Sequence, residues 1–135
     1  MNANARRILV VNQEPAVRLE LCRVLSEGGY LVTFIDNSAD AILYACLEPP
    51  DLVILDISMS GIDGIQFGRI LRRIPETRDI PLLFLTDLIS KDEDDDRNLF
   101  IDRNLTITMP CDTEELLIEI EMLMSKPVSE TKNAI

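Results

Sequence analysis

The stretch LVILDISMSGIDG, residues 52–64, decides the fold class of this chain. Its first six residues are nearly all apolar, which is typical of a strand covered on both faces of a sheet. The remaining seven residues contain two glycines and predict a loop. This stretch therefore predicts a buried parallel strand that ends near Asp56 and runs directly into a loop.

Strand-like and helix-like patterns alternate on both sides of that stretch. Helical patterns with one apolar face separate five strand-like segments. The five predicted strands are residues 7–11, 31–35, 52–57, 80–86 and 105–110. Alternation at this regular spacing predicts parallel β-α-β units, and hence an α/β fold: a three-layer sandwich with a five-stranded parallel sheet.

Helix limits and domain limits also follow from local signals. Pro15 marks the start of the first helix, Ser38 caps the second, and Asp112 or Thr113 caps the last. The five consecutive acids at residues 92–96 allow a short helix that starts near Asp92, although their mutual repulsion makes it marginal. We expect one domain over residues 1–125 and a flexible tail or linker over residues 126–135.

Composition excludes several classes of function. The chain has 135 residues, of which 47% are hydrophobic, and a net charge of -11. Such a charge repels nucleic-acid phosphates and anionic lipids, so we expect no nucleic-acid or membrane role and favour a protein partner with a basic face. The N-terminus leads into no apolar signal region and no apolar run is long enough to span a bilayer, which predicts a cytoplasmic protein.

Histidine is absent from the chain and its three cysteines are far apart, so a zinc site is not expected. Cys22 and Cys46 fall on the apolar sides of predicted helices, where we expect small buried thiols. Cys111 follows a predicted strand end, and a redox role would require a basic neighbour.

Polar residues follow the predicted strands at one edge of the sheet. In open parallel sheets the ligand crevice lies beyond the carboxyl ends of the strands. The residues expected there are Asn12, Gln13 and Glu14 after the first strand, Asp56 near the end of the third, Thr86 after the fourth and Met109 after the fifth. This group holds the functional content of the sequence.

From about Arg7 to Met124 the chain resembles the receiver domains of two-component response regulators. The resemblance rests on ILVV…EP at residues 8–15, PDLVILDISMSGIDG at residues 50–64, IPLLFLT at residues 80–86, and Pro110 followed by DTEELL. It implies a flavodoxin-like sheet with strand order 2-1-3-4-5. It also implies phosphotransfer from a histidine kinase to Asp56, aided by Mg²⁺, by the hydroxyl of Thr86 and by a lysine just before the proline of the fifth strand.

The chain departs from the receiver pattern at most of its charged positions. The acidic pair expected after the first strand is Asn12 and Gln13, and the lysine is Met109. Ser60 stands where proline is usual, and Thr106 where an aromatic residue is common. An amide oxygen can coordinate Mg²⁺ but brings no negative charge. We therefore predict weak or absent Mg²⁺ binding, no metal ligands and a degenerate, pseudo-receiver site.

The two amides have an alternative purpose. Without the lysine, carboxylates at positions 12, 13 and 56 would repel one another in an empty pocket. Amides at 12 and 13 could instead donate hydrogen bonds to Asp56 and keep it charged without a metal, while Met109 fills the space of the lysine. The predicted pocket comprises Asn12, Gln13, Glu14, Ser58, Thr86 and Met109 around Asp56.

The last predicted helix carries apolar residues on two sides. Ile118 and Met122 fall among glutamates on the side opposite the inward face, which comprises Leu116, Leu117, Ile120, Leu123 and Met124. Many receivers dimerise or meet targets through the face made by their fourth helix, fifth strand and fifth helix. The resemblance therefore implies a protein interface, and a possible homodimer, at Ile118 and Met122.

Two functions remain open at this point. The first is a non-enzymatic signalling module that acts by protein–protein contact without phosphorylation, with a histidine kinase or an output protein as partner. The second is an atypical phosphoacceptor that still uses Asp56. An unrelated flavodoxin-like enzyme or ligand binder is disfavoured, because the chain has no Gly-rich phosphate loop and no nucleophile–base pair.

Overall fold

The structure is a computed structural model and describes residues 5–56, 64–86, 98–101, 104–108 and 113–125. Four helices and six strands occur in this described part of the chain. Their order is β1 (Arg7–Val11), α1 (Pro15–Glu27), β2 (Leu31–Ile35), α2 (Ser38–Leu47), β3 (Leu52–Asp56), α3 (Gly64–Arg73), β4 (Leu82–Thr86), β5 (Asn98–Ile101), β6 (Asn104–Thr108) and α4 (Thr113–Ser125).

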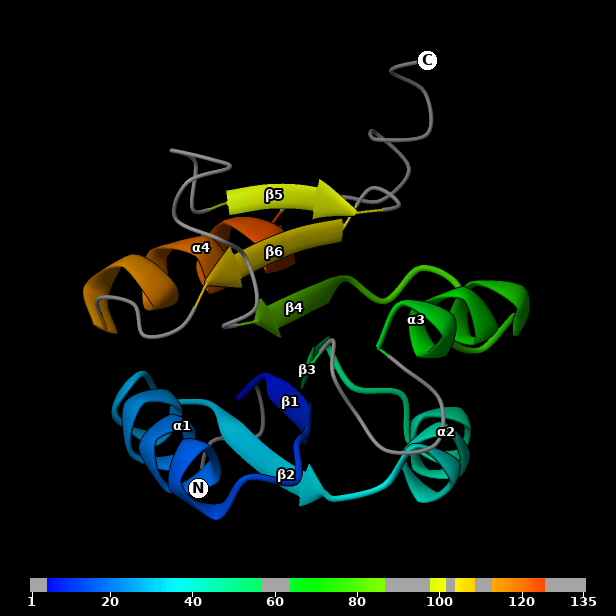
Figure 1. Cartoon of the computed structure of the whole chain (residues 1–135), viewed down its shortest axis with the longest axis horizontal. Helices are drawn as coiled ribbons and strands as arrows, with labels where there is room; N and C mark the ends of the chain where they lie inside the picture. The colour runs from blue at the N-terminus through cyan, green and yellow to red at the C-terminus, as the bar shows by residue number, and fades with distance from the viewer. Residues whose placement is uncertain (1–4, 57–63, 87–97, 102–103, 109–112, 126–135) are drawn as a thin grey trace.

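A single sheet forms the centre of the molecule, with strand order β2-β1-β3-β4-β6-β5 (Figure 1). Four pairs of the described strands are parallel, as expected for β-α-β units: β2–β1, β1–β3, β3–β4 and β4–β6. The predicted α/β fold with a parallel sheet is therefore confirmed.

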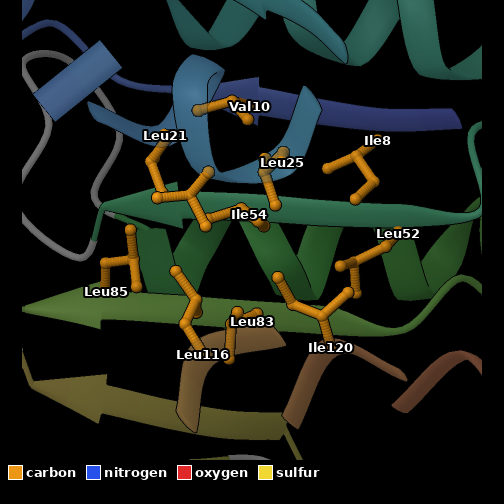
Figure 2. Close-up of a cluster of buried hydrophobic side chains, with 11 residues drawn as sticks. Ile8, Val10, Leu21, Leu25, Leu52, Ile54, Leu83, Leu85, Leu116 and Ile120 are labelled. Atoms are coloured by element: carbon orange, nitrogen blue, oxygen red, sulfur yellow. The ribbon is translucent and has the colours of Figure 1, made fainter. Parts of the chain in front are cut away.

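Helices cover both faces of the sheet, because side chains of successive strand residues point to opposite faces. On one face, Ile8, Ile54 and Leu83 pack with α1 and α4, as Figure 2 shows. On the other face, Leu9, Val53 and their neighbours pack with α2 and α3. Two apolar layers thus enclose the central strands, which explains why the sequence of β3 is an almost continuous apolar run.

The number of strands is a correction to the sequence-based expectation. We expected five parallel strands and a marginal helix near Asp92; residues 87–97 lie outside the described part of the chain. Residues 98–101 form an additional strand, β5, which was not predicted. It pairs antiparallel with β6. Only three consecutive apolar residues occur there, too few for a helical face but enough for a short strand beside a partner that is already formed.

Of two predicted helix starts in the described residues, the first is confirmed and the second is wrong by one residue. Pro15 begins α1 as expected, but α2 is capped by Asn37 and not by Ser38. The Asn37 side-chain oxygen accepts the main-chain N–H of Asp40 at 2.8 Å, and Ser38 is the first helical residue. The cap expected at Asp112 and the tail at residues 126–135 lie outside the described residues.

The expectation that Cys22 and Cys46 are buried thiols was wrong. Cys22 is exposed on α1 and Cys46 is only half-buried on α2. Each lies one residue beyond a buried position, Leu21 and Ala45 respectively, and one helical residue turns the side chain by about 100°. No described helix is long and apolar enough to cross a membrane.

Candidate functional site

Strand register brings three predicted site residues to the same edge of the sheet. Val11 pairs with Leu55, so Asn12 comes level with Asp56 at the carboxyl ends of β1 and β3. Asp56 in turn pairs with Leu85, the residue before Thr86 on β4. Asn12, Asp56 and Thr86 therefore end three adjacent strands, as the sequence analysis expected.

Asn12 is the most buried polar residue of this edge, with an exposed fraction of 2%. Its main-chain N–H donates to the Ile35 carbonyl at 3.2 Å, which continues the β1–β2 pairing past the strand end. Its side-chain oxygen accepts the main-chain N–H of Glu14 at 2.7 Å. This short turn carries the chain from β1 into α1, where Pro15 then presets the helical backbone.

Gln13 connects the site to the neighbouring loop. Its amide nitrogen donates to the main-chain oxygen of Asp36 at 3.2 Å. Asp36 immediately follows β2, so the bond joins the loops that leave β1 and β2. Both amides thus make hydrogen bonds that hold the loops at the carboxyl edge in place.

The carboxylates of the edge have different surroundings. Glu14 is exposed, and its side chain makes no capping hydrogen bond to α1. Asp56 is half-buried at the end of β3. Ser58 and Met109, the remaining predicted pocket residues, lie outside the described part of the chain.

The residue types present fit a divalent cation poorly. Mg²⁺ prefers hard anionic oxygens in an octahedral array, and two neighbours of Asp56 in the predicted site are neutral amides. Across the described segments, no group of three or more His, Cys, Asp or Glu side chains could hold a metal ion. The prediction of weak or absent Mg²⁺ binding remains a prediction, which direct titration must decide.

The last helix presents the apolar pair that the sequence analysis selected. Ile118 is 59% exposed and Met122 is 60% exposed on α4, whereas Leu116 and Ile120 are buried against the sheet. Their position on the outer face is as expected, and their role in an interface is untested.

Sequence analysis missed a second set of exposed apolar side chains. Leu31 at the start of β2, and Leu43 and Leu47 on α2, are all more than half exposed. The spacing of Leu43 and Leu47, four residues apart and off the face of Ala41 and Ala45, could have revealed them. The buried face of α2 is made largely of alanine, so hydrophobicity alone did not separate its inner side from its outer side.

Comparison with known proteins identifies the family. Residues 8–121 match the sequence pattern of the response regulator receiver domain. The chain belongs to this family. Its relatives include the phosphate regulon transcriptional regulatory protein PhoB of Escherichia coli, 36% identical over 122 residues that cover 90% of this chain and 53% of PhoB. Protein PilH of Pseudomonas aeruginosa is 32% identical over 121 residues, covering 88% of this chain and 98% of PilH.

Solved structures agree with the family at the level of fold. The signal receiver domain of a signal transduction histidine kinase from Syntrophus aciditrophicus superimposes with a TM-score of 0.74 at 30% identity, covering 90% of this chain and 91% of that one. Chemotaxis protein CheY4 of Vibrio cholerae gives a TM-score of 0.74 at 20% identity, covering 88% and 98%. The receiver-type, flavodoxin-like fold is thereby established.

Family membership fixes the general role of the chain as a receiver domain of two-component signalling, a class of modules that meets histidine kinases and output domains. The chain spans about half the length of PhoB and several other curated relatives that it matches.

Proposed function

We propose that this receiver domain signals by protein–protein contact and without phosphorylation of Asp56. The proposal rests on the hydrogen bonds that Asn12 and Gln13 make. The first is buried and holds the turn into α1, and the second bonds the Asp36 carbonyl. At positions 12 and 13 the family pattern has acids that bind the cation, whereas this chain has neutral amides that hold the loops.

Charge arithmetic supports a weak phosphotransfer site. Replacing two carboxylates by amides removes two attractive pairs with Mg²⁺, and each such pair at about 4 Å is worth several kcal/mol at the effective dielectric of a protein surface. Met109 in place of lysine removes an ammonium from the transferring group, and a preorganised donor of this kind lowers a barrier by about 3 kcal/mol. The two losses together slow phosphorylation by several orders of magnitude.

The contact surface in this proposal is the outer face of α4. Ile118 and Met122 give it an apolar centre, and exposed Glu114 and Glu121 surround that centre with negative charge. We infer a partner with an apolar patch inside a basic rim, either a histidine kinase or an output protein. We further propose that this contact takes place in the cytoplasm.

A second candidate function is an atypical phosphoacceptor. Asp56 remains half-buried at the strand end beside the β4 terminus, and exposed Glu14 lies two residues after Asn12. In that case Asp56 would attack phosphorus while Thr86 and Glu14 supplied the remaining polar groups.

Treatment with acetyl phosphate and Mg²⁺ separates the two functions. We expect intact-mass spectrometry to show no phosphoryl adduct on the native chain and a clear adduct on Asn12→Asp/Gln13→Asp/Met109→Lys, the variant that restores the family pattern. Asp56→Asn in both backgrounds is the control for the site of modification. A native adduct that Asp56→Asn removes would replace our proposal with the second function.

Partner capture tests the contact surface. Ile118→Lys/Met122→Lys should abolish binding to the kinase or output protein that co-purifies with the native chain, while the thermal midpoint stays unchanged. Leu19→Lys is the matched control, because Leu19 is 74% exposed on α1 and lies outside the proposed surface. Equal binding by the double variant and the native chain would contradict this assignment.

A further inference from the structure

The outer edge of β2 supports an inference that does not depend on the proposed function. β2 lies at one end of the sheet and pairs with β1 alone among the described strands (Figure 1). Its sequence, LVTFI, contains no charge, no proline and no glycine. Edge strands usually carry such residues because they prevent pairing with another chain.

The hydrogen bonds at the two ends of β2 show which main-chain N–H and carbonyl groups point away from β1. The Leu31 N–H donates to the Arg6 carbonyl at 2.9 Å, and the Ile35 carbonyl accepts the Asn12 N–H at 3.2 Å. Residues 31 and 35, and therefore Thr33 between them, direct their main-chain groups toward β1. Alternate residues of a strand point these groups to opposite sides, so Val32 and Phe34 direct theirs outward.

This arrangement is complementary to itself. In an antiparallel pair of two β2 strands centred on Thr33, Val32 of one copy comes opposite Phe34 of the other. Both residues direct N–H and carbonyl outward, so each pair exchanges two hydrogen bonds. A register shifted by one residue would place outward groups opposite inward groups. We propose that two copies of this chain associate through β2, antiparallel and centred on Thr33, into one continuous sheet.

Charges at the two ends of β2 favour a second copy as the occupant. Arg6 precedes β1, and its positive charge opposes the rise in the pKa of Tyr30 that burial and the hydrogen-bonded Glu121 of α4 produce, so this end of β2 carries a cation beside an anion. In the proposed register, Tyr30 comes opposite Asp36 of the other copy, which is exposed directly after β2. Arg6 and Asp36 therefore form complementary ends, and the two-fold axis produces this contact twice.

Exposed leucines extend the same edge. Leu31 is 54% exposed and shares its face of β2 with Thr33, whose hydroxyl lies 3.3 Å from the Tyr44 hydroxyl of α2. Leu47, 72% exposed, follows Tyr44 by three residues and so lies on the β2 side of α2. Pairing through the sheet edge places both copies of α2 on one face, where Leu47 of each copy loses solvent exposure.

A cysteine at the two-fold axis tests the register. In a background with Cys22, Cys46 and Cys111 replaced by serine, Thr33→Cys should form a disulfide-linked dimer on mild oxidation. The two Cα atoms of this central, non-hydrogen-bonded pair are about 4.5 Å apart, within the range of a disulfide. Leu31→Cys is the matched control. In the proposed register residue 31 lies opposite residue 35 of the other copy, so the two introduced cysteines are four residues, or about 13 Å, apart along the strands.

Sedimentation velocity tests the association itself. We expect concentration-dependent dimerisation that Val32→Pro weakens roughly tenfold or more, since symmetry removes two hydrogen bonds with one substitution. Proline is tolerated where an edge N–H faces solvent, and circular dichroism checks the fold. The measurements include high salt, because screening reduces repulsion between copies with a net charge of -11.

Three results would overturn the proposal. The first is a monomer at every concentration and salt, as expected if another segment of the chain or a different protein covers β2. The second is crosslinking of Leu31→Cys in preference to Thr33→Cys. The third is a dimer that Ile118→Lys/Met122→Lys abolishes and Leu31→Lys/Leu47→Lys leaves intact, which would place the interface on α4.

Discussion

The interior of the sheet and its carboxyl edge follow different rules in this molecule. In the interior, aliphatic residues such as Ile54 and Leu83 are fully buried and pack together on one face of the sheet. At the edge, Asn12 and Gln13 replace the expected acids while the strands still end at the same level. The comparison teaches that the fold depends on apolar packing behind the edge and tolerates a change of charge at the edge itself.

The largest expected effect lies in the interior. Ile54→Ala should lower the free energy of unfolding by about 3–4 kcal/mol, because it removes buried methyl groups and leaves a cavity between β3 and the helices of that face. Urea denaturation measures the change. Leu19→Ala, at an exposed position, should change stability by less than about 0.5 kcal/mol. Similar losses in the two variants would show that the interior contributes less than we infer.

A buried hydroxyl gives the next largest effect. Thr77 is fully buried, and its hydroxyl donates to the Leu71 carbonyl at 2.7 Å near the end of α3. Thr77→Val should cost about 1–2 kcal/mol, because that carbonyl loses its shorter hydrogen bond and keeps the longer one from the Ile74 main-chain N–H at 3.3 Å. Urea denaturation again applies, with Glu76→Ala at the exposed neighbour as the control. An unchanged midpoint would mean that water or another donor replaces the hydroxyl.

A charge added at the edge should have a smaller effect that depends on Mg²⁺. Asn12→Asp keeps an oxygen for the Glu14 N–H but adds an anion level with Asp56. Without Mg²⁺ the free energy of unfolding should fall by about 1 kcal/mol, and added Mg²⁺ should restore it.

Combining Asn12→Asp with Asp56→Asn provides the control for that prediction. If the two carboxylates repel each other, the second change should relieve the loss, which a double-mutant cycle measures. Additive effects would show that positions 12 and 56 do not interact.

The smallest effect concerns alkaline pH. Partial burial raises the pKa of Tyr30, and Glu121 adds to the shift through its charge and its 3.4 Å hydrogen bond, while Arg6 opposes it. A raised pKa in the folded state stabilises the fold below the ordinary tyrosine pKa of 10.0, and this contribution is lost as the pH rises through the pKa of the folded state. Tyr30→Phe should therefore lose less stability than the native chain between about pH 9 and pH 11.

Urea midpoints across that range test the prediction for Tyr30. Glu121→Gln should also flatten the profile, since it removes the anion and keeps an acceptor. A native profile as flat as that of Tyr30→Phe would contradict the coupling between α4 and the residue before β2.

Particular elements show how far sequence reasoning reached. The apolar runs at β1, β3 and β4 predicted a covered parallel sheet because burial on both faces leaves no alternative pattern. Register then placed Asn12, Asp56 and Thr86 at adjacent strand ends, as predicted. The β5 strand was missed because a short segment forms a strand only when a neighbouring edge is available, and that edge belongs to β6.

The exposure of single side chains on the helices was harder to predict than the arrangement of the strands. Cys22 and Leu47 are exposed although each lies close to buried residues in the sequence. Their orientation depends on how α1 and α2 rotate as they pack, and alanines and short side chains allow several rotations of similar energy. The Asn37 cap was missed for a different reason: Asn37 and Ser38 are adjacent and both are good cap residues, so residue type does not choose between them.

The sequence by itself determined the α/β class, the family and the loss of charge at positions 12, 13 and 109, since these depend on residue type and order alone. Tertiary structure decided that Asn12 is buried in a turn, that β5 pairs with β6, and that Val32 and Phe34 direct their main-chain groups to an edge with no partner among the described strands. These features arise from hydrogen bonds between segments far apart in the chain, and no local pattern specifies such partners in advance.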